Sequence, residues 1–219
     1  MADSKIMICG DIHGDWASLN TLISKKKPSL ILQAGDFGYW PREPKYALEK
    51  IKPHDTKIYF CDGNHEDHWA LKDVKDNELA PNIFYMSRGS VMTLPDGRNV
   101  LFFGGADSID KEDRTLGFDW FPEEIPSYRD LAAIDEIDMK IDIVISHTCP
   151  EDFTEMDQWK WKDKVTDPTR KLLSVILDRF KPDLWYFGHW HDFLQGTCKG
   201  CKYTMMGHTH SGRWGIELE

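Results

Sequence analysis

The sequence predicts an α/β fold built around a mainly parallel sheet, and two observations lead to this prediction. Short apolar runs alternate with segments of helical periodicity along the chain. The runs are continuous rather than alternating with polar residues, which is typical of strands covered on both faces. Because 219 residues suffice to bury a large core, we expect βαβ units within one domain spanning residues 1–219.

The expected elements follow in chain order. Strands are predicted at residues 5–9, 30–34, 57–61, 83–86, 91–94, 100–104, 141–146, 184–187, 193–197, 203–206 and 214–218. Helices are predicted at residues 16–24, around 46–51, around 127–136 and at 169–180. The sequence PDGR at 95–98 is typical of a hairpin turn. A loop insertion rich in acids and aromatics is expected at about 104–126, and a polar loop carrying Trp159 and Trp161 at 149–168.

Composition and charge narrow the function classes. A net charge of −10 argues against nucleic-acid binding, which depends on Lys and Arg contacts to phosphate, but a bound metal would still let the protein hold small anions. Membrane spans need about 20 consecutive apolar residues, and the sequence has no such run and no secretory signal. The five cysteines are best interpreted as reduced thiols. We expect a cytoplasmic protein without membrane contact, and its oligomeric state stays open.

Polar residues that bind metals follow five of the predicted strands, mostly beside a glycine. In chain order they are Asp11 and His13, Asp36, Asn64 and His65, His147, and His189 with His191. Because ligands of open α/β sheets bind outside the carboxyl ends of the strands, these side chains are expected to converge. Two carboxylates, several imidazoles and an amide oxygen form a ligand set for two metals such as Mn²⁺, Fe or Zn²⁺. One such motif alone is typical of an ordinary turn.

The ordered motifs GDIHG, GDFG, GNHE, SH and GHWH resemble those of the calcineurin-like metallophosphoesterases, over residues 5–191. The resemblance implies a two-sheet α/β sandwich flanked by helices. It also implies two bound divalent metal ions, for which Mn²⁺ is our first choice and Fe or Zn²⁺ are the alternatives. By motif, the first metal would be bound by Asp11, His13 and His191. The second would be bound by Asn64, His147 and His189, with Asp36 bridging the two.

The resemblance also implies a mechanism for hydrolysis of a phosphate ester. A metal-bridging hydroxide would attack phosphorus in line, and His65 would protonate the leaving group as general acid. Asp62 and Glu66 are expected to orient neighbouring imidazoles, with a solvated helix start as the alternative for Glu66.

The substrate is less well indicated than the reaction. Protein phosphatases of this family carry Asp-Arg-Gly where this chain has GDFG, which is closer to the branch acting on small phosphodiesters and nucleotides. Arg42 lies a few residues further on and could substitute for the missing arginine, although nothing in the sequence requires it. Residues 104–124 resemble a segment of a bacterial and phage-type subgroup. We expect Arg114 to touch a phosphate oxygen there, with an ion-paired scaffold as the alternative, and Arg88 as a weaker candidate.

Three functions therefore stay open. The first is a metal-dependent phosphoesterase acting on small or nucleotide-like phosphodiesters or monoesters. The second is a phosphoprotein phosphatase for serine and threonine. The third is a non-catalytic scaffold that binds a protein partner, which is disfavoured because every expected ligand position is filled.

Several other motifs have structural interpretations. A second GHxH, GHTH at 207–210, follows the expected C-terminal hairpin, so we assign the metal ligands to GHWH and leave His208 and His210 near the site or in a polar turn. Cys198 and Cys201 form a single CxxC, which suits a hairpin turn with free thiols better than a four-ligand zinc site. His54 and His68 are predicted to lie at the surface.

Overall fold

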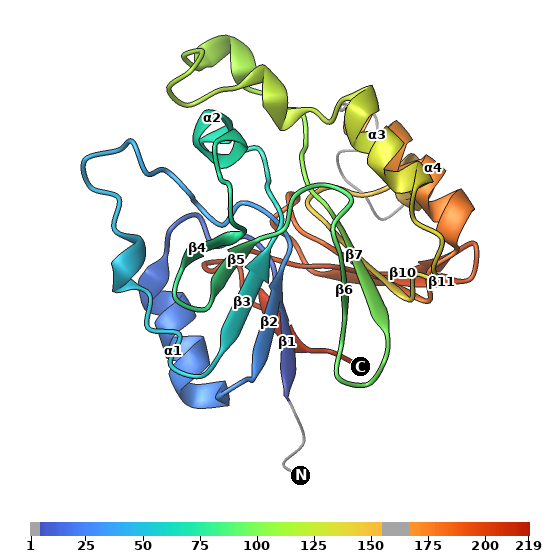
Figure 1. The fold of residues 1–219 in the computed structure, drawn as a ribbon, viewed down its shortest axis with the longest axis horizontal. Coiled ribbons are helices and arrows are strands. Elements are labelled where there is room, and N and C mark those ends of the chain that lie inside the picture. Colours follow the sequence, from blue (N-terminus) through green and yellow to red (C-terminus); the bar gives the residue numbers. More distant parts are fainter. Residues whose placement is uncertain (1–4, 155–166) are drawn as a thin grey trace.

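A computed structural model describes residues 5–154 and 167–219, so Trp159 and Trp161 lie outside the described residues. Two six-stranded sheets face each other, and helices cover their outer faces (Figure 1). The predicted α/β fold and the two-sheet sandwich are therefore confirmed.

The first sheet has the strand order β12-β1-β2-β3-β5-β4. Its strands are β1 (Ile6–Cys9), β2 (Leu30–Gln33), β3 (Lys57–Phe60), β4 (Glu78–Ala80), β5 (Ile83–Tyr85) and β12 (Gly215–Glu217). The inner pairs run parallel, with Ile8 opposite Leu32, whereas both edge strands pair antiparallel.

The second sheet repeats this plan with the order β10-β11-β9-β8-β7-β6. Its strands are β6 (Val91–Thr93), β7 (Asn99–Phe103), β8 (Ile143–Ser146), β9 (Leu184–Phe187), β10 (Leu194–Cys198) and β11 (Cys201–Met205). Antiparallel hairpins form both edges, and parallel pairs lie between them. The sheet is thus mixed, and its three central pairings are parallel.

Alternate residues of each central strand face two different cores, which explains the continuous apolar runs. Ile6 and Ile8 of β1 belong to the core between the sheets, whereas Met7 and Cys9 pack toward α1 (Trp16–Lys26). In the second sheet, even-numbered residues of β7 face the first sheet and odd-numbered ones face the outer helices. A strand in this position exposes neither face to water, so both of its faces must be apolar.

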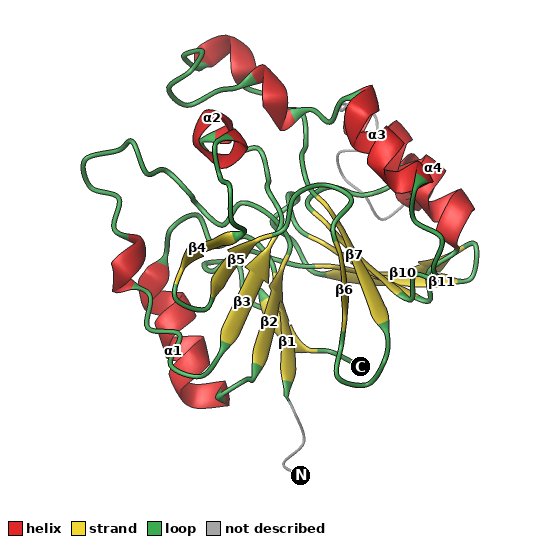
Figure 2. Cartoon of the chain, viewed as in Figure 1, coloured by secondary structure: helices red, strands yellow, loops and turns green. Residues whose placement is uncertain are grey.

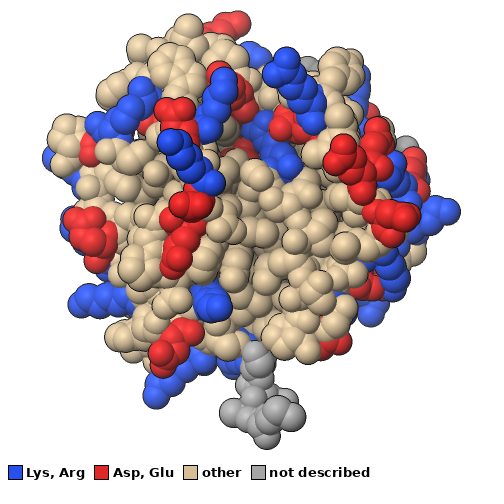
Figure 3. Space-filling view, viewed as in Figure 1, with Lys and Arg blue, Asp and Glu red and all other residues tan. Residues whose placement is uncertain are grey.

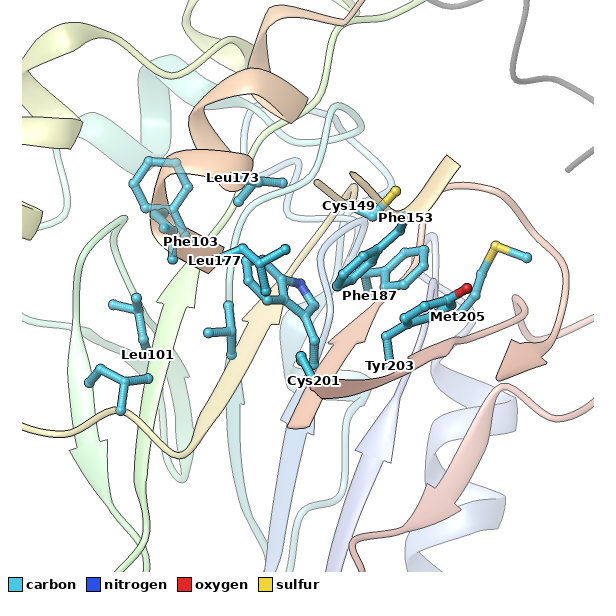
Figure 4. Packing of buried hydrophobic residues seen from close by; sticks show 14 of the residues in the cluster. Leu101, Phe103, Cys149, Phe153, Leu173, Leu177, Phe187, Cys201, Tyr203 and Met205 are labelled. Carbon is cyan, nitrogen blue, oxygen red and sulfur yellow. The ribbon is translucent and has the colours of Figure 1, made fainter. Parts of the chain in front are cut away.

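The outer helices begin at side chains that cap them. Asp15 accepts a hydrogen bond from the Ser18 amide at the start of α1, and Asp167 does the same for Thr169 at the start of α4 (Pro168–Phe180). Ser127 forms a capping box at α3 (Tyr128–Asp135). Leu173 of α4 lies beside the second sheet in the close view of Figure 4.

The insertion predicted at 104–126 connects β7 to α3 and crosses above α2 (His68–Lys72), as Figure 2 shows. It contains two 3₁₀ turns, η2 (Lys111–Asp113) and η3 (Pro122–Glu124). The helix predicted around 46–51 is a single 3₁₀ turn, η1 (Leu48–Lys50), and another, η4 (Glu151–Thr154), precedes α4. Neither α2 nor β4 was predicted, because each spans too few residues to give a periodic pattern.

The structure decides the smaller predictions as well. Cys198 lies opposite Cys201 in the register of the β10–β11 hairpin, and neither forms a disulfide, which confirms the hairpin interpretation. His54 is exposed as predicted. The prediction for His68 was wrong: its ring is only 5% exposed, because it begins α2 directly behind the carboxylate of Asp62.

Charged side chains of both signs are dispersed over the surface. On the face seen in Figure 3, acidic and basic side chains lie interspersed around the rim, so the net charge is not gathered there into one acidic patch. Among the described residues, no helix is both long enough and apolar enough to cross a bilayer.

Arg88 lies in the interior and binds Asp62, which corrects its place as a candidate for substrate contact. Its guanidinium donates to Asp62 at 3.0 and 2.6 Å and to the carbonyl oxygens of Glu123 and Glu124 at 2.8 and 3.1 Å. Burial alone would raise the pKa of Asp62, but Arg88 and His68 bring that pKa below its usual value. Arg88 thus fixes the end of the insertion to the end of β3.

We expect Arg88→Met to lower the free energy of unfolding by about 3–5 kcal/mol, because it leaves a buried carboxylate without its partner. The matched control is Arg98→Met, whose partner Asp96 has 47% of its side chain exposed; a surface pair of this kind contributes at most about 1 kcal/mol. Urea unfolding measures both. Equal losses in the two variants would contradict the structural role given to Arg88.

Candidate metal centre

The loops that follow β1 and β2 are tied together by their backbones. The amides of Ile12 and His13 donate to the carbonyl oxygen of Asp36 at 3.0 and 2.8 Å, and the amide of Gly14 donates to that of Phe37. These bonds bring the first two predicted motifs side by side. The motifs after β8 and β9 approach from the second sheet, so the predicted ligands meet at the carboxyl ends of strands from both sheets.

One group of predicted ligands forms the first candidate metal position. Asp11, His13, Asp36 and His191 each place a donor atom within 4.8 Å of the others. His191 Nε2 lies 3.0 Å from Asp11 Oδ2 and 3.2 Å from His13 Nε2. His13 Nε2 is also 3.6 Å from Asp36 Oδ2. Donor atoms that share a metal at about 2.1 Å lie about 3 Å apart, so these separations suit one ion.

The other group of predicted ligands lies on the opposite oxygen of Asp36 and forms a second candidate position. His147 Nε2 lies 3.3 Å from Asp36 Oδ1 and 3.0 Å from Asn64 Oδ1. His189 Nδ1 is 3.0 Å from the same amide oxygen and 3.2 Å from His147 Nε2. The two oxygens of Asp36 therefore face different ligand groups, which is the arrangement of a bridging carboxylate.

The donor chemistry of the second position fits a cation. His147 Nδ1 lies 2.9 Å from the carbonyl oxygen of Ala34, so this nitrogen carries a hydrogen, and Nε2 is the atom that would present a lone pair to a metal on losing its proton. Asn64 Oδ1 is also an acceptor, and it lies only 3.0 Å from that nitrogen. Two facing acceptors repel each other unless a proton or a metal ion lies between them. Imidazole and carboxylate ligands of this kind suit Mn²⁺, Fe or Zn²⁺.

The pKa values of Asp36, His147 and His189 show how these buried groups influence one another. Burial would raise the pKa of Asp36, but His147, His65 and His13 hold it well below its usual value. Burial lowers the pKa of His147, yet the Asp36 carboxylate outweighs burial and raises that pKa to about 10. Burial and the neighbouring His147 lower the pKa of His189 well below its usual value. The buried Asp36 carboxylate therefore stays ionised and is balanced by the positive charge of neighbouring imidazoles.

Four of the proposed ligands have strained backbone conformations. His13, Asp36, His189 and His191 have φ angles of 49°, 52°, 68° and 55°, in the left-handed region that side chains seldom adopt. Strain of this kind persists where the surroundings impose it, typically at functional sites. The strand ends also approach very closely, because a Cβ on Gly63 would collide with the Asp36 carboxylate.

The remaining predicted residues line a cavity of about 330 Å³ beside the centre. The amide of His65 donates to Asp36 Oδ1 at 2.8 Å, and its ring lies edge-on to His13. Arg114 Nη2 lies 3.0 Å from His65 Nε2 and 2.8 Å from Asp110 Oδ1. Arg114 is thus paired with an acid and also lines the cavity, and its contact with a phosphate oxygen stays a prediction.

Other expectations are corrected. Arg42 pairs with Asp67 and donates to the carbonyl oxygen of Gly117 at 3.2 Å, so its guanidinium is engaged away from the cavity. Glu66 orients no imidazole: it is fully buried, and its carboxylate accepts hydrogen bonds from the amides of Gly38 and Gly63. The solvated alternative for Glu66 is wrong for the same reason.

The second GHxH motif lies next to the centre without joining either ligand group. The ring centroid of His208 is 4.6 Å from that of His191, and His210 Nε2 lies 3.8 Å from Asp15 Oδ2. The amide of Thr209 donates to the carbonyl oxygen of Asp11 at 3.2 Å. This motif therefore packs against the first candidate position without contributing an atom to its ligand group.

Sequence reasoning missed several residues of the site. Ile109 and Trp190 line the cavity. Ser108 and Glu124 are hydrogen-bonded behind Asn64. All except Trp190 lie in the insertion, and only the glycines before Ser108 indicated that its backbone approaches the strand ends.

Comparison with protein families decides which family this centre belongs to. The model of the calcineurin-like phosphoesterases matches residues 4–193, which contain all seven proposed ligands. The chain belongs to the calcineurin-like phosphoesterase family. The relation to a bacterial or phage-type subgroup stays a prediction.

The curated relatives that the chain matches are distant and longer. Human CWF19-like protein 1 is 23% identical over 155 residues, covering 67% of this chain and 28% of the relative. The lariat debranching enzyme of Schizosaccharomyces pombe is 24% identical over 221 residues, covering 85% of this chain and 48% of the relative. The chain thus spans less than half the length of each. The crystal structure of TT1561 of Thermus thermophilus has a TM-score of 0.60 at 14% identity, covering 99% of this chain and 98% of that one, which shows a shared fold.

Proposed function

We propose that the chain is a phosphoesterase with a dinuclear metal centre, acting on a small or nucleotide-like phosphorylated substrate. The observation that carries this proposal is the meeting of the two ligand groups on opposite oxygens of Asp36, at the wall of one cavity. A cavity of about 330 Å³ is at the lower end of the sizes typical for small-molecule sites, which favours a small substrate over a phosphoprotein.

Each residue has a role in this mechanism. Asp11, His13 and His191 would hold one divalent ion, Asn64, His147 and His189 the other, and Asp36 both. When bound, such ions supply Lewis acidity and lower the pKa of water. His65, at the cavity wall, donates a proton to the departing oxygen of the ester.

Two alternatives receive less support. A phosphoprotein phosphatase would need an arginine in place of Phe37, and Arg42 does not supply it because it is held by Asp67. A non-catalytic scaffold would have no use for strained ligand conformations and a cavity beside them.

The deciding experiment compares a chromogenic phosphomonoester with a chromogenic phosphodiester, using Mn²⁺-loaded protein and Asp36→Asn as the blank. We expect the unaltered protein to hydrolyse at least one of the two esters and Asp36→Asn to hydrolyse neither. A preference for the diester would support nucleotide-like substrates. A preference for the monoester would favour the phosphatase alternative, and phosphopeptides would then be tested as substrates. Failure on both with two bound metals would contradict the proposal and favour the scaffold.

We expect Arg114→Ala to lower kcat/KM by about 10- to 100-fold, since a charge-assisted hydrogen bond to phosphate contributes about 1.5–3 kcal/mol. Bound Mn²⁺ should be unchanged, because Arg114 belongs to neither ligand group. Steady-state kinetics and metal analysis test both expectations, with Arg129→Ala as an exposed control. Unchanged kinetics would leave Arg114 a scaffold residue paired with Asp110.

A further inference from the structure

A chain of buried hydrogen bonds runs from the insertion to a ligand of the second metal position. Asn64 Nδ2 donates to Ser108 Oγ at 3.1 Å, and Ser108 Oγ donates to Glu124 Oε2 at 2.8 Å. The three residues are 4%, 1% and 0% exposed. Water therefore cannot replace any bond of this chain.

The carboxylate at its far end determines the direction of every bond. Glu124 Oε1 accepts from the amide of Ser108 at 2.6 Å and from Trp120 Nε1 at 3.1 Å. An ionised carboxylate has no hydrogen to give, so Ser108 must use its single hydroxyl hydrogen toward Glu124. The hydroxyl can then only accept from the other side, and it accepts from the NH₂ group of Asn64.

This direction has a consequence for the metal centre. The two ends of an asparagine amide are nearly identical in shape, so packing alone does not decide which end faces His147 and His189. Only the oxygen end can bind a cation. We propose that Glu124, acting through Ser108, is a positioning residue that holds the Asn64 oxygen toward the second metal. The proposal rests on the dinuclear site proposed above.

One isosteric substitution can reverse the donor-to-acceptor direction of these hydrogen bonds. In Glu124→Gln, the new amide can accept from the Ser108 amide and from Trp120 only if its NH₂ group faces the hydroxyl. Ser108 would then direct its hydrogen toward Asn64, and the Asn64 amide would turn to accept it. The NH₂ group of Asn64 would face the imidazoles and bind no metal. In Ser108→Ala nothing forces this rotation, so its effect should be smaller.

The test titrates Mn²⁺ into metal-free protein by calorimetry at pH 8, above the pKa of about 7 to which burial raises Glu124. We expect two sites in the unaltered chain and an affinity about 10- to 100-fold lower at one of them in Glu124→Gln. The control Glu123→Gln removes the same charge from the adjacent residue and should bind both ions normally.

The double variant Glu124→Gln with Ser108→Ala distinguishes positioning from a general structural role. Without the hydroxyl no reversed bond reaches Asn64, so adding Ser108→Ala should return the weakened site to the level of Ser108→Ala alone. Additive losses, equal losses at both sites, or full affinity in Glu124→Gln would overturn the proposal. If the unaltered protein binds two ions but hydrolyses no ester, the proposed function is contradicted, whereas the positioning role of Glu124 is not.

Discussion

Asp36→Asn is expected to lower kcat by at least about 10³-fold, because the Lewis acidity of bound metals contributes several kcal/mol to stabilising the transition state. The carboxylate is 1% exposed and faces both ligand groups. Asparagine has the same shape and can still accept the hydrogen bond that the His65 amide donates at 2.8 Å. The variant therefore removes the negative charge from both metal positions and keeps the loop in place.

Metal analysis and unfolding experiments separate the possible causes of that loss. We expect fewer than two Mn²⁺ ions per chain, and a metal-free variant that remains folded but is less stable than the unaltered metal-free chain, because His147 loses the carboxylate that lies 3.3 Å from it. Asp15→Asn makes the same chemical change at the cap of α1, where asparagine also serves well. Full activity of Asp36→Asn, or two tightly bound ions, would show that this carboxylate does not bridge the centre.

The framework of this centre could be predicted from sequence because it follows the strand order. Each proposed ligand lies within four residues of the end of a strand, and the carboxyl ends of parallel strands meet whatever the details of packing. The continuous apolar runs likewise indicated strands between two layers, as β1 and β7 are. These features depend on local pattern and on topology alone.

The rest depends on side-chain contacts that no local pattern records. His68 looked like a surface residue because it stands among charged neighbours, yet the buried Asp62 holds it in the interior. Glu124 looked like one of several acids in a loop, and only its three hydrogen-bond donors distinguish it from Glu123. The insertion has neither helical nor strand periodicity, so its folding against Asn64 could not be foreseen.

His65→Ala is expected to lower kcat by about 10²- to 10⁴-fold on a substrate whose leaving group is an alkoxide, the usual contribution of a general acid. The loss should be much smaller on a nitrophenyl ester, because nitrophenolate departs without needing a proton. Both metal ions should stay bound, since the His65 side chain belongs to neither ligand group. Steady-state kinetics on an alkyl and a nitrophenyl ester of the same phosphate measure the difference.

The comparison of leaving groups is what makes this prediction specific to proton transfer. His65 also borders the cavity and lies 3.0 Å from Arg114, so a truncated ring could impair substrate binding as well. A binding defect lowers the rates on both esters equally, whereas loss of an acid affects only the ester that needs one. His54→Ala provides the control on an exposed histidine. Equal losses on both esters would assign His65 to binding and leave the leaving group to be protonated by another donor.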